Sequence, residues 1–319
     1  MNGKYFLGII AGIFSGITWA IYTIINNLLT QNKIFLPYSD KMYIPILTII
    51  FMHDFFSMLW LFFYLKKNKK ISRIKEVLRN KNIHLIFIGA LLGGPIGMSG
   101  YLLGIKYIGA SYMASFSSFY LIIGTFLSIL FLKEKIKLRM LFAVILNVIG
   151  IFIINFNWNK IFEINFNTET LFGLIFLLFC IFGWASEGLI ASYILKYKKT
   201  SIEPEVAIFI RQLTSTLLYG LLIIPYIKAY GLVFEIFKNE ILLIVAFISI
   251  VGSLSFFLWY YSMSIIGVAK GISLNISYIL WTIIFEVICF NIKFQVNFIL
   301  ASCLFLISVI LIATLPEEK

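Results

Sequence analysis

Residues 172–192 read FGLIFLLFCIFGWASEGLIAS, an apolar run whose single charged residue is Glu187. A transmembrane helix needs about 20 consecutive apolar residues to cross the hydrocarbon core of a bilayer. Inside lipid the backbone must satisfy its own hydrogen bonds, so only helices and closed barrels span it. Because this run is continuously apolar and does not alternate with polar residues, it predicts a transmembrane helix.

The rest of the chain repeats this pattern. Of its 319 residues, 61% are hydrophobic and only 13% are charged, whereas charged residues make up about a quarter of a soluble domain. We therefore expect an all-α membrane protein with ten transmembrane helices. The predicted spans are 4–30, 43–65, 83–104, 109–132, 138–156, 170–195, 204–227, 241–264, 271–290 and 296–315.

Lysines and arginines are distributed unevenly between the connections on the two sides. With the N-terminus in the cytoplasm, 18 of them lie on the cytoplasmic side and 7 outside, while Arg211 lies within a span. This bias predicts that both termini are cytoplasmic in a bacterial inner membrane. The first span is too long for a signal peptide and lacks a cleavage site, so we expect it to be retained. The net charge of +12 then reflects membrane topology and gives no indication of nucleic-acid binding.

Matching residues recur between the two halves of the chain. At a shift of 158 residues, the pairs include Ile108 with Ile266, Gly109 with Gly267, and Tyr120 with Tyr278; a shift of 165 places Trp19 on Trp184. The predicted domains, 1–158 and 159–319, contain five spans each, and an odd number gives the two halves opposite orientations in the membrane. Such an inverted repeat is the structural basis of alternating access around a site near the membrane midplane.

Several motifs run through the chain in the same order as in a known group of transporters. They are HDFFS at 53–57, GALLGGPIGM at 89–98, KYIGAS at 106–111, FLKEKI at 131–136, GWASE at 183–187, IRQLTS at 210–215 and LNISYILWT at 274–282. Two five-helix halves with this loop pattern resemble the drug/metabolite transporter superfamily in its EamA-type branch. The motifs resemble more specifically the LicB-type choline permeases, and this resemblance implies import of choline or a similar quaternary ammonium cation.

Aromatic residues near the middle of the spans are candidates for binding such a cation. A quaternary ammonium has no N–H to donate, so a site holds it through aromatic faces and negative charge. Trp19 and Trp184 occupy matching positions in the two halves, and Tyr22 lies on the same helix face as Trp19. The alternative for the tryptophans is an interfacial belt or simple space filling, and their depth argues against the belt.

The eighth and ninth predicted spans supply further candidates. Trp259, Tyr260 and Tyr261 are consecutive, so they point about 100° apart and only one or two can face a cavity; we favour Tyr260. Asn275 and Tyr278 are three residues apart and share a helix face. The alternative for each tyrosine is a hydroxyl group bonded to a neighbouring helix.

Acidic residues within the spans are rare, and intramembrane charges are functional by default. Glu187 lies about one turn beyond Trp184, so a carboxylate and an aromatic ring share one face. Asp54 is the second candidate, although it and Arg211 could instead form a structural ion pair. Glu286 lies near the outer end of its span, where it can also reach interfacial water. The roles of Arg211, His53 and Glu286 are left unassigned.

The chain shows no glycine-rich nucleotide loop, zinc-ligand spacing or nucleophile–base arrangement. Its cysteines, Cys180, Cys289 and Cys303, lie in apolar runs without pairing or metal spacing, and His53 and His84 do not form a metal site by themselves. We therefore expect no catalytic residues, no metal and no cofactor.

The leading hypothesis is a secondary transporter that imports a quaternary amine, driven by the membrane potential, with a coupled proton left open. An exporter of amino acids or amphipathic cations on the same fold is the alternative. A non-transporting membrane scaffold is the alternative from another class, and it has no need for paired aromatics and a buried acid. The expected partners are a small-molecule cation and the lipid bilayer, while the oligomeric state and the coupling ion stay open.

Overall fold

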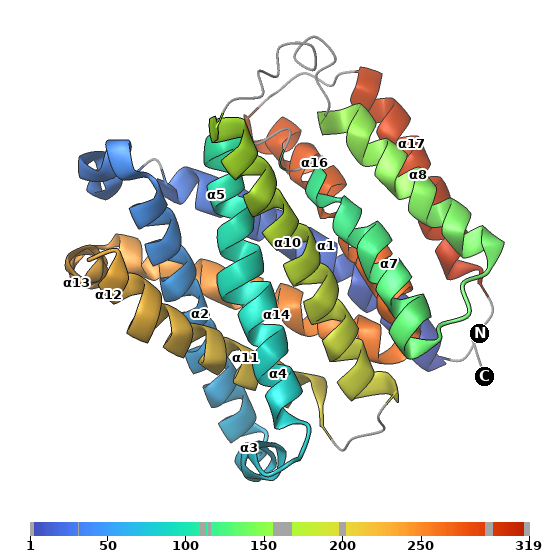
Figure 1. Cartoon of the computed structure of the whole chain (residues 1–319), viewed down its shortest axis with the longest axis horizontal. Coiled ribbons are helices and arrows are strands. Elements are labelled where there is room, and N and C mark those ends of the chain that lie inside the picture. Colours follow the sequence, from blue (N-terminus) through green and yellow to red (C-terminus); the bar gives the residue numbers. More distant parts are fainter. Residues whose placement is uncertain are drawn as a thin grey trace.

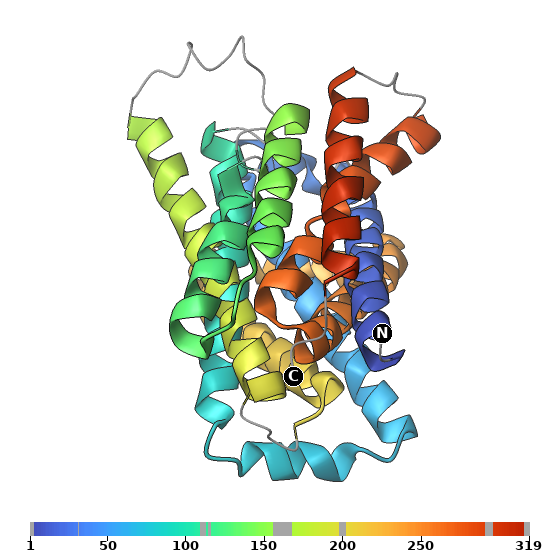
Figure 2. The ribbon, with the colours of Figure 1, turned by 90° about the vertical axis from the view of Figure 1, so that its right-hand side faces the viewer.

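The computed structural model describes residues 3–30, 32–108, 113, 116–155, 168–197, 202–290 and 296–315. Over these ranges the chain forms helices and turns and contains no strand. The long helices pack side by side, and the N-terminal end of α1 and the C-terminal end of α17 lie at the same end of the bundle (Figures 1 and 2).

Seven helical segments of the described ranges are long and apolar enough to cross a membrane. Three of them are uninterrupted helices: α1 (Gly3–Thr30), α2 (Tyr43–Lys67) and α14 (Ile241–Ile266). Four consist of consecutive pieces. The first joins α4 (Ile83–Leu91), η2 (Leu92–Met98) and α5 (Ser99–Ile108), and the second joins α10 (Thr168–Ser192) and η3 (Tyr193–Tyr197). The third joins α11 (Pro204–Leu218), η4 (Tyr219–Ile223) and α12 (Ile224–Tyr226), and the fourth joins α15 (Val268–Asn275) and α16 (Tyr278–Phe290).

Shorter apolar helices lie at the three remaining predicted spans: α7 (Phe119–Leu132), α8 (Leu138–Asn155) and α17 (Val296–Ala313). Outside the predicted spans, the structure adds η1 (Lys33–Lys41), α3 (Ile71–Leu78) and α13 (Tyr230–Lys238). The prediction of an all-α, multi-pass membrane protein is confirmed. The count of ten spans and the inverted repeat stay predictions.

The main helix contacts join the first half of the chain to the second. α1 packs against α14, α10 packs against α5, α2 packs against α11, and α8 packs against α17 (Figure 1). The first helix of each predicted half thus contacts the third span of the other half. Two related halves would interlock in this way.

The basic segment after α2 forms α3, which lies crosswise at one end of the bundle (Figure 2). Val77 is buried, and Ile71 and Ile74 pack against the core, while Arg73 and Lys75 point to the surface. The apolar face of this amphipathic helix therefore covers the end of the bundle.

The GGPIG motif brings η2 into close contact with α10. Pro95 lies inside η2, where it has no N–H to donate and its ring clashes with the preceding turn, and the helix locally widens to a π-helical turn. A side chain at Gly93 would overlap the Glu187 carboxylate, and one at Gly97 would lie 2.8 Å from Cδ1 of Trp184. Only glycine allows this approach, which holds Trp184 and Glu187 against η2.

A second irregular segment lies between α15 and α16, at Ile276 and Ser277. Gly16 of α1 fits against it, since a Cβ atom there would lie 2.9 Å from the Asn275 carbonyl oxygen and 3.0 Å from the Tyr278 nitrogen. Interrupted helices at membrane depth are typical of substrate sites in transporters. The break places Asn275 and Tyr278 on either side of it.

Candidate functional site

A small cavity, with a volume of about 50 Å³, lies where α1, η2, α10, α14 and the break between α15 and α16 meet. Five of the eight residues predicted from the sequence line it: Trp19, Trp184, Glu187, Asn275 and Tyr278. The other lining residues were not among those eight: Gly93, Met98, Tyr120, Ser255, Phe256 and Trp259.

Aromatic rings from both halves surround the cavity. Trp19 meets Phe256 edge to face with ring centroids 5.4 Å apart. Trp184 meets Tyr120 in the same way at 5.7 Å. Such contacts fix ring orientation and contribute about 0.5–1.5 kcal/mol each beyond burial. The cavity therefore has a preorganised aromatic wall.

Trp259, and not the favoured Tyr260, lines the cavity from α14. The Trp259 ring is buried beside Phe256, with centroids 6.5 Å apart. Tyr260 turns away and donates a hydrogen bond of 2.9 Å from its hydroxyl group to Oε1 of Glu187. Tyr260 thus contacts the site through Glu187, so the alternative expected for a tyrosine hydroxyl, a bond to a neighbouring helix, applies to it.

Tyr22 and Asp54 lie behind the cavity wall. The Tyr22 ring packs between Trp19 and His53, with centroids 4.8 Å from each. Its burial makes it a support for Trp19. Asp54 belongs to the charged cluster described below.

The polar edge of the cavity is held by bonds between helices. Asn275 donates a hydrogen bond of 2.9 Å from Nδ2 to the hydroxyl group of Ser15. Ser255 donates one of 2.8 Å to the Ser15 carbonyl oxygen. These bonds fix α1 against α14 and the helix break, so Asn275 has a structural role in addition to lining the cavity.

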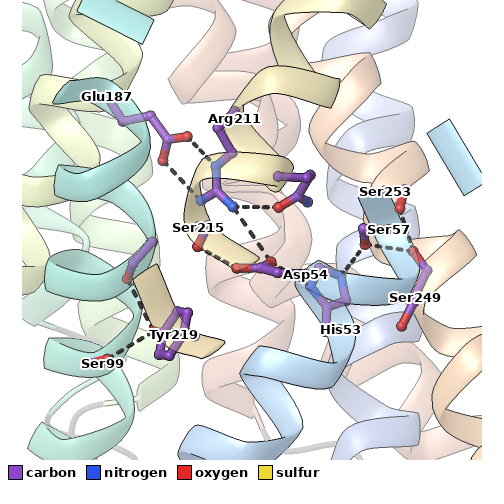
Figure 3. Close-up of polar contacts among 12 residues, drawn as sticks. His53, Asp54, Ser57, Ser99, Glu187, Arg211, Ser215, Tyr219, Ser249 and Ser253 are labelled. Atoms are coloured by element: carbon purple, nitrogen blue, oxygen red, sulfur yellow. Dashed lines mark hydrogen bonds and ion pairs between the residues drawn. The ribbon is translucent and has the colours of Figure 1, made fainter. Parts of the chain in front are cut away.

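Arg211 lies between Glu187 and Asp54, and all three side chains are at most 3% exposed (Figure 3). Its Nε donates to Oε1 of Glu187 at 2.8 Å, and one terminal nitrogen lies 3.6 Å from Oδ1 of Asp54. The ion pair considered between Asp54 and Arg211 is therefore present, but the shorter contact joins Arg211 to Glu187. The sequence did not predict that partner, although a buried arginine needs a carboxylate.

A chain of hydrogen bonds continues from Asp54 toward α14 (Figure 3). Ser215 donates to Oδ2 of Asp54 at 2.5 Å, and Nδ1 of His53 lies 3.0 Å from Oδ1. His53 in turn contacts Ser57, whose hydroxyl group donates to the Ser249 carbonyl oxygen at 3.2 Å. With two carboxylates and one guanidinium, this cluster has a formal charge of −1 when His53 is neutral. One of the two carboxylates, that of Glu187, lines the cavity.

The three cysteines do not line the described cavity. Cys180 is buried, and Cys289 and Cys303 are exposed free thiols. Glu286 lies in α16, but its side chain is outside the described part of the structure.

Comparison with known proteins gives three findings. Residues 6–156 match the EamA-like transporter family. The chain is 29% identical over 277 residues to Protein LicB of Haemophilus influenzae, covering 86% of this chain and 87% of that protein. A solved crystal structure superposes with a TM-score of 0.72 over 95% of each chain at 12% identity, a likeness that concerns the fold alone.

Proposed function

We propose that this chain is a membrane transporter of the drug/metabolite transporter superfamily that imports choline or a similar quaternary ammonium cation, because residues 6–156 match the EamA-like transporter family. The observation that carries the proposal is the cavity that combines aromatic rings from both halves with one carboxylate, Glu187. The sequence motifs that resemble choline permeases support the same substrate.

The cavity has the chemistry that a permanent cation requires. Each aromatic face contributes about 0.5–2 kcal/mol to binding a desolvated cation. Three or four such contacts with a nearby carboxylate approach the roughly 8 kcal/mol of micromolar affinity. The formal charge of the cluster behind the wall has the sign that attracts a monovalent cation.

An exporter of amino acids on the same fold is the alternative. A lysine or arginine would stabilise the carboxylate of an amino acid, and among the described lining residues there is neither. Arg211 stands behind the wall, paired with Glu187. The lining therefore favours a quaternary amine over an amino acid, and it leaves amphipathic cations as competitors.

The membrane potential supplies a sufficient driving force. Moving one positive charge inward through 100 mV releases about 2.3 kcal/mol, which corresponds to roughly forty- to fifty-fold accumulation. We propose alternating access between two inverted halves with both termini in the cytoplasm. Single cysteines in place of the exposed Lys33 and Lys75 test the orientation, since labelling of both from one side contradicts it.

Uptake of radiolabelled choline into proteoliposomes tests the function. A potential that is negative inside should drive accumulation, and collapse of that potential should abolish it; a pH gradient imposed separately shows whether a proton is coupled. Excess unlabelled choline should compete strongly and excess ethanolamine weakly, because the cavity offers few acceptors for N–H groups. Absence of protein-dependent choline uptake under every gradient contradicts the proposal.

A further inference from the structure

Arg211 lies directly beside Glu187, the carboxylate that lines the cavity. We propose, building on the proposed function, that Arg211 is a tethered substitute for the substrate. It neutralises Glu187 when the cavity is empty and shifts toward Asp54 when a cation binds. The empty transporter can then reorient between its inward-facing and outward-facing states, so it can carry out net transport. A transporter without this arginine would be restricted to exchange.

The guanidinium group already lies between two acceptors. It donates to Glu187 at 2.8 Å from Nε and lies 3.6 Å from Asp54 through a terminal nitrogen. Gln212 accepts a hydrogen bond of 2.8 Å from that same terminal nitrogen. Arg211 thus already contacts both carboxylates, so it can strengthen its contact with Asp54 while it gives up its bonds to Glu187.

Arg211 and a bound cation would also share an aromatic ring. The central carbon of the guanidinium lies 4.4 Å from the centroid of Phe256, which lines the cavity. A cation in the cavity and Arg211 thus compete for one carboxylate and are stabilised by one ring. A residue that substitutes for the substrate must use the same carboxylate and the same aromatic ring as the substrate.

The physical reason for such a device is the cost of a buried charge. An uncompensated carboxylate in a low-dielectric interior costs several kcal/mol, and an ion pair offsets much of this cost. Any occluded state that the empty carrier passes through would carry that cost on Glu187 if Arg211 were absent. With Arg211 present, Glu187 is paired with the arginine in the empty carrier and with the substrate in the loaded one.

The test compares net uptake with exchange in proteoliposomes that contain wild type or Arg211→Gln. We expect Arg211→Gln to reduce net choline uptake by about ten-fold or more, the effect of an unpaired buried carboxylate on the return step. Exchange of labelled for unlabelled choline, which needs no empty return, should stay within about three-fold of wild type, below 1 kcal/mol. Arg139→Gln, which removes an exposed arginine, is the matched control.

Two further variants keep the test decisive. The double variant Glu187→Gln, Arg211→Gln removes the carboxylate along with its partner, so the ratio of net uptake to exchange should return toward the wild-type value. Arg211→Lys keeps a cation and should retain net uptake, and these two variants decide the matter if Arg211→Gln does not fold.

Equal losses of net uptake and exchange in folded Arg211→Gln would overturn the inference, as would no loss of either. A wild-type protein that does not move choline contradicts the proposed function instead. In that case the same ratio is measured with whichever amine stabilises the purified protein, so the two failures remain distinguishable.

Discussion

The segment that contains α2 and α3 is tied to α11 at two places whose environments differ. In the bundle interior, Asp54 of α2 contacts Arg211 of α11, and Glu187 joins them, with every side chain nearly inaccessible. At the end of the bundle that carries α3, Lys70 bonds to Glu203, and to Glu205 at 2.5 Å, with about a third of the Lys70 and Glu203 side chains exposed. The same kind of bond therefore serves in two different environments.

The difference lies in the cost of desolvation. An exposed ion pair stabilises a protein by about 0–1 kcal/mol and costs little to form. A buried pair gives up several kcal/mol of hydration per ion and is retained where a charge is required. The interior cluster adjoins the cavity, whereas the edge cluster holds α3 and the start of α11 together. The costly cluster is thus the one we assign to transport.

Removal of the cation at each place should give the largest contrast. Arg211→Ala leaves two buried carboxylates without their cation, and we expect a loss of about 3–5 kcal/mol of stability. Lys70→Ala should cost about 1 kcal/mol or less. Unfolding of the two purified variants in the same detergent compares them, and equal losses would remove the distinction between the two clusters.

The aromatic wall should be the next most sensitive part. Trp19→Ala or Trp184→Ala should weaken choline binding by about 1–3 kcal/mol, roughly ten- to a hundred-fold. Phenylalanine at either position should be milder because it keeps a weaker aromatic face. Trp60, which is exposed and does not line the cavity, is the control, and Trp60→Ala should leave the affinity unchanged. Full wild-type affinity in both cavity variants would contradict our placement of the site.

The negative charge of Glu187 should contribute to choline binding more than the shape of its side chain. Glu187→Gln is isosteric and should preserve the fold while weakening choline binding by about ten-fold, or about 1.4 kcal/mol. Glu203→Gln, the same change in the edge cluster, should leave binding unaltered. If Glu187 also carries a coupled proton, Glu187→Gln should abolish uptake driven by a pH gradient and leave part of the uptake driven by potential. Binding that is unaffected by Glu187→Gln would argue against a role for its charge.

The smallest effect concerns the edge cluster and pH. The hydrogen bond from Lys70 lowers the pKa of Glu203 below its usual value of 4.5, and the bonds to Glu203 and Glu205 raise the pKa of Lys70. A carboxylate whose pKa is lowered in the folded state stabilises the fold at pH values above its unfolded-state pKa. This contribution is lost as the pH falls through the folded-state pKa. The stability difference between wild type and Lys70→Ala, about 1 kcal/mol or less, should therefore shrink below about pH 4.5. A difference that is constant down to pH 3 would show that Glu203 does not depend on Lys70.

Composition and the internal repeat were enough to predict the apolar helices and the two tryptophans of the cavity. Trp19 and Trp184 match across the halves, and each lies deep in a span, so position alone identified them. The sequence favoured Tyr260, whereas Trp259 lines the cavity. The two neighbouring residues differ only by the rotation of α14 about its axis. That rotation is set by packing, including the bond from Ser255 to Ser15, which hydropathy does not contain.

The pairing of Arg211 with Glu187 was missed for a related reason. The two residues lie on different helices of the second half, and the sequence offered Asp54 as an equally suitable partner. Their contact depends on how closely α10 approaches its neighbours, and Gly93 and Gly97 permit that approach. A glycine-rich motif opposite an intramembrane acid was the available signal.

The central claim is that the cavity binds its substrate through positive charge on aromatic faces. Calorimetric titration of the purified protein with choline, and with the neutral alcohol in which carbon replaces the ammonium nitrogen, tests it most directly, because the two ligands share one shape. We predict that choline binds at least about ten-fold more tightly, a difference of 1.4 kcal/mol or more, and that Trp184→Ala narrows the gap. Equal affinities for the two ligands in the wild-type protein would contradict the account.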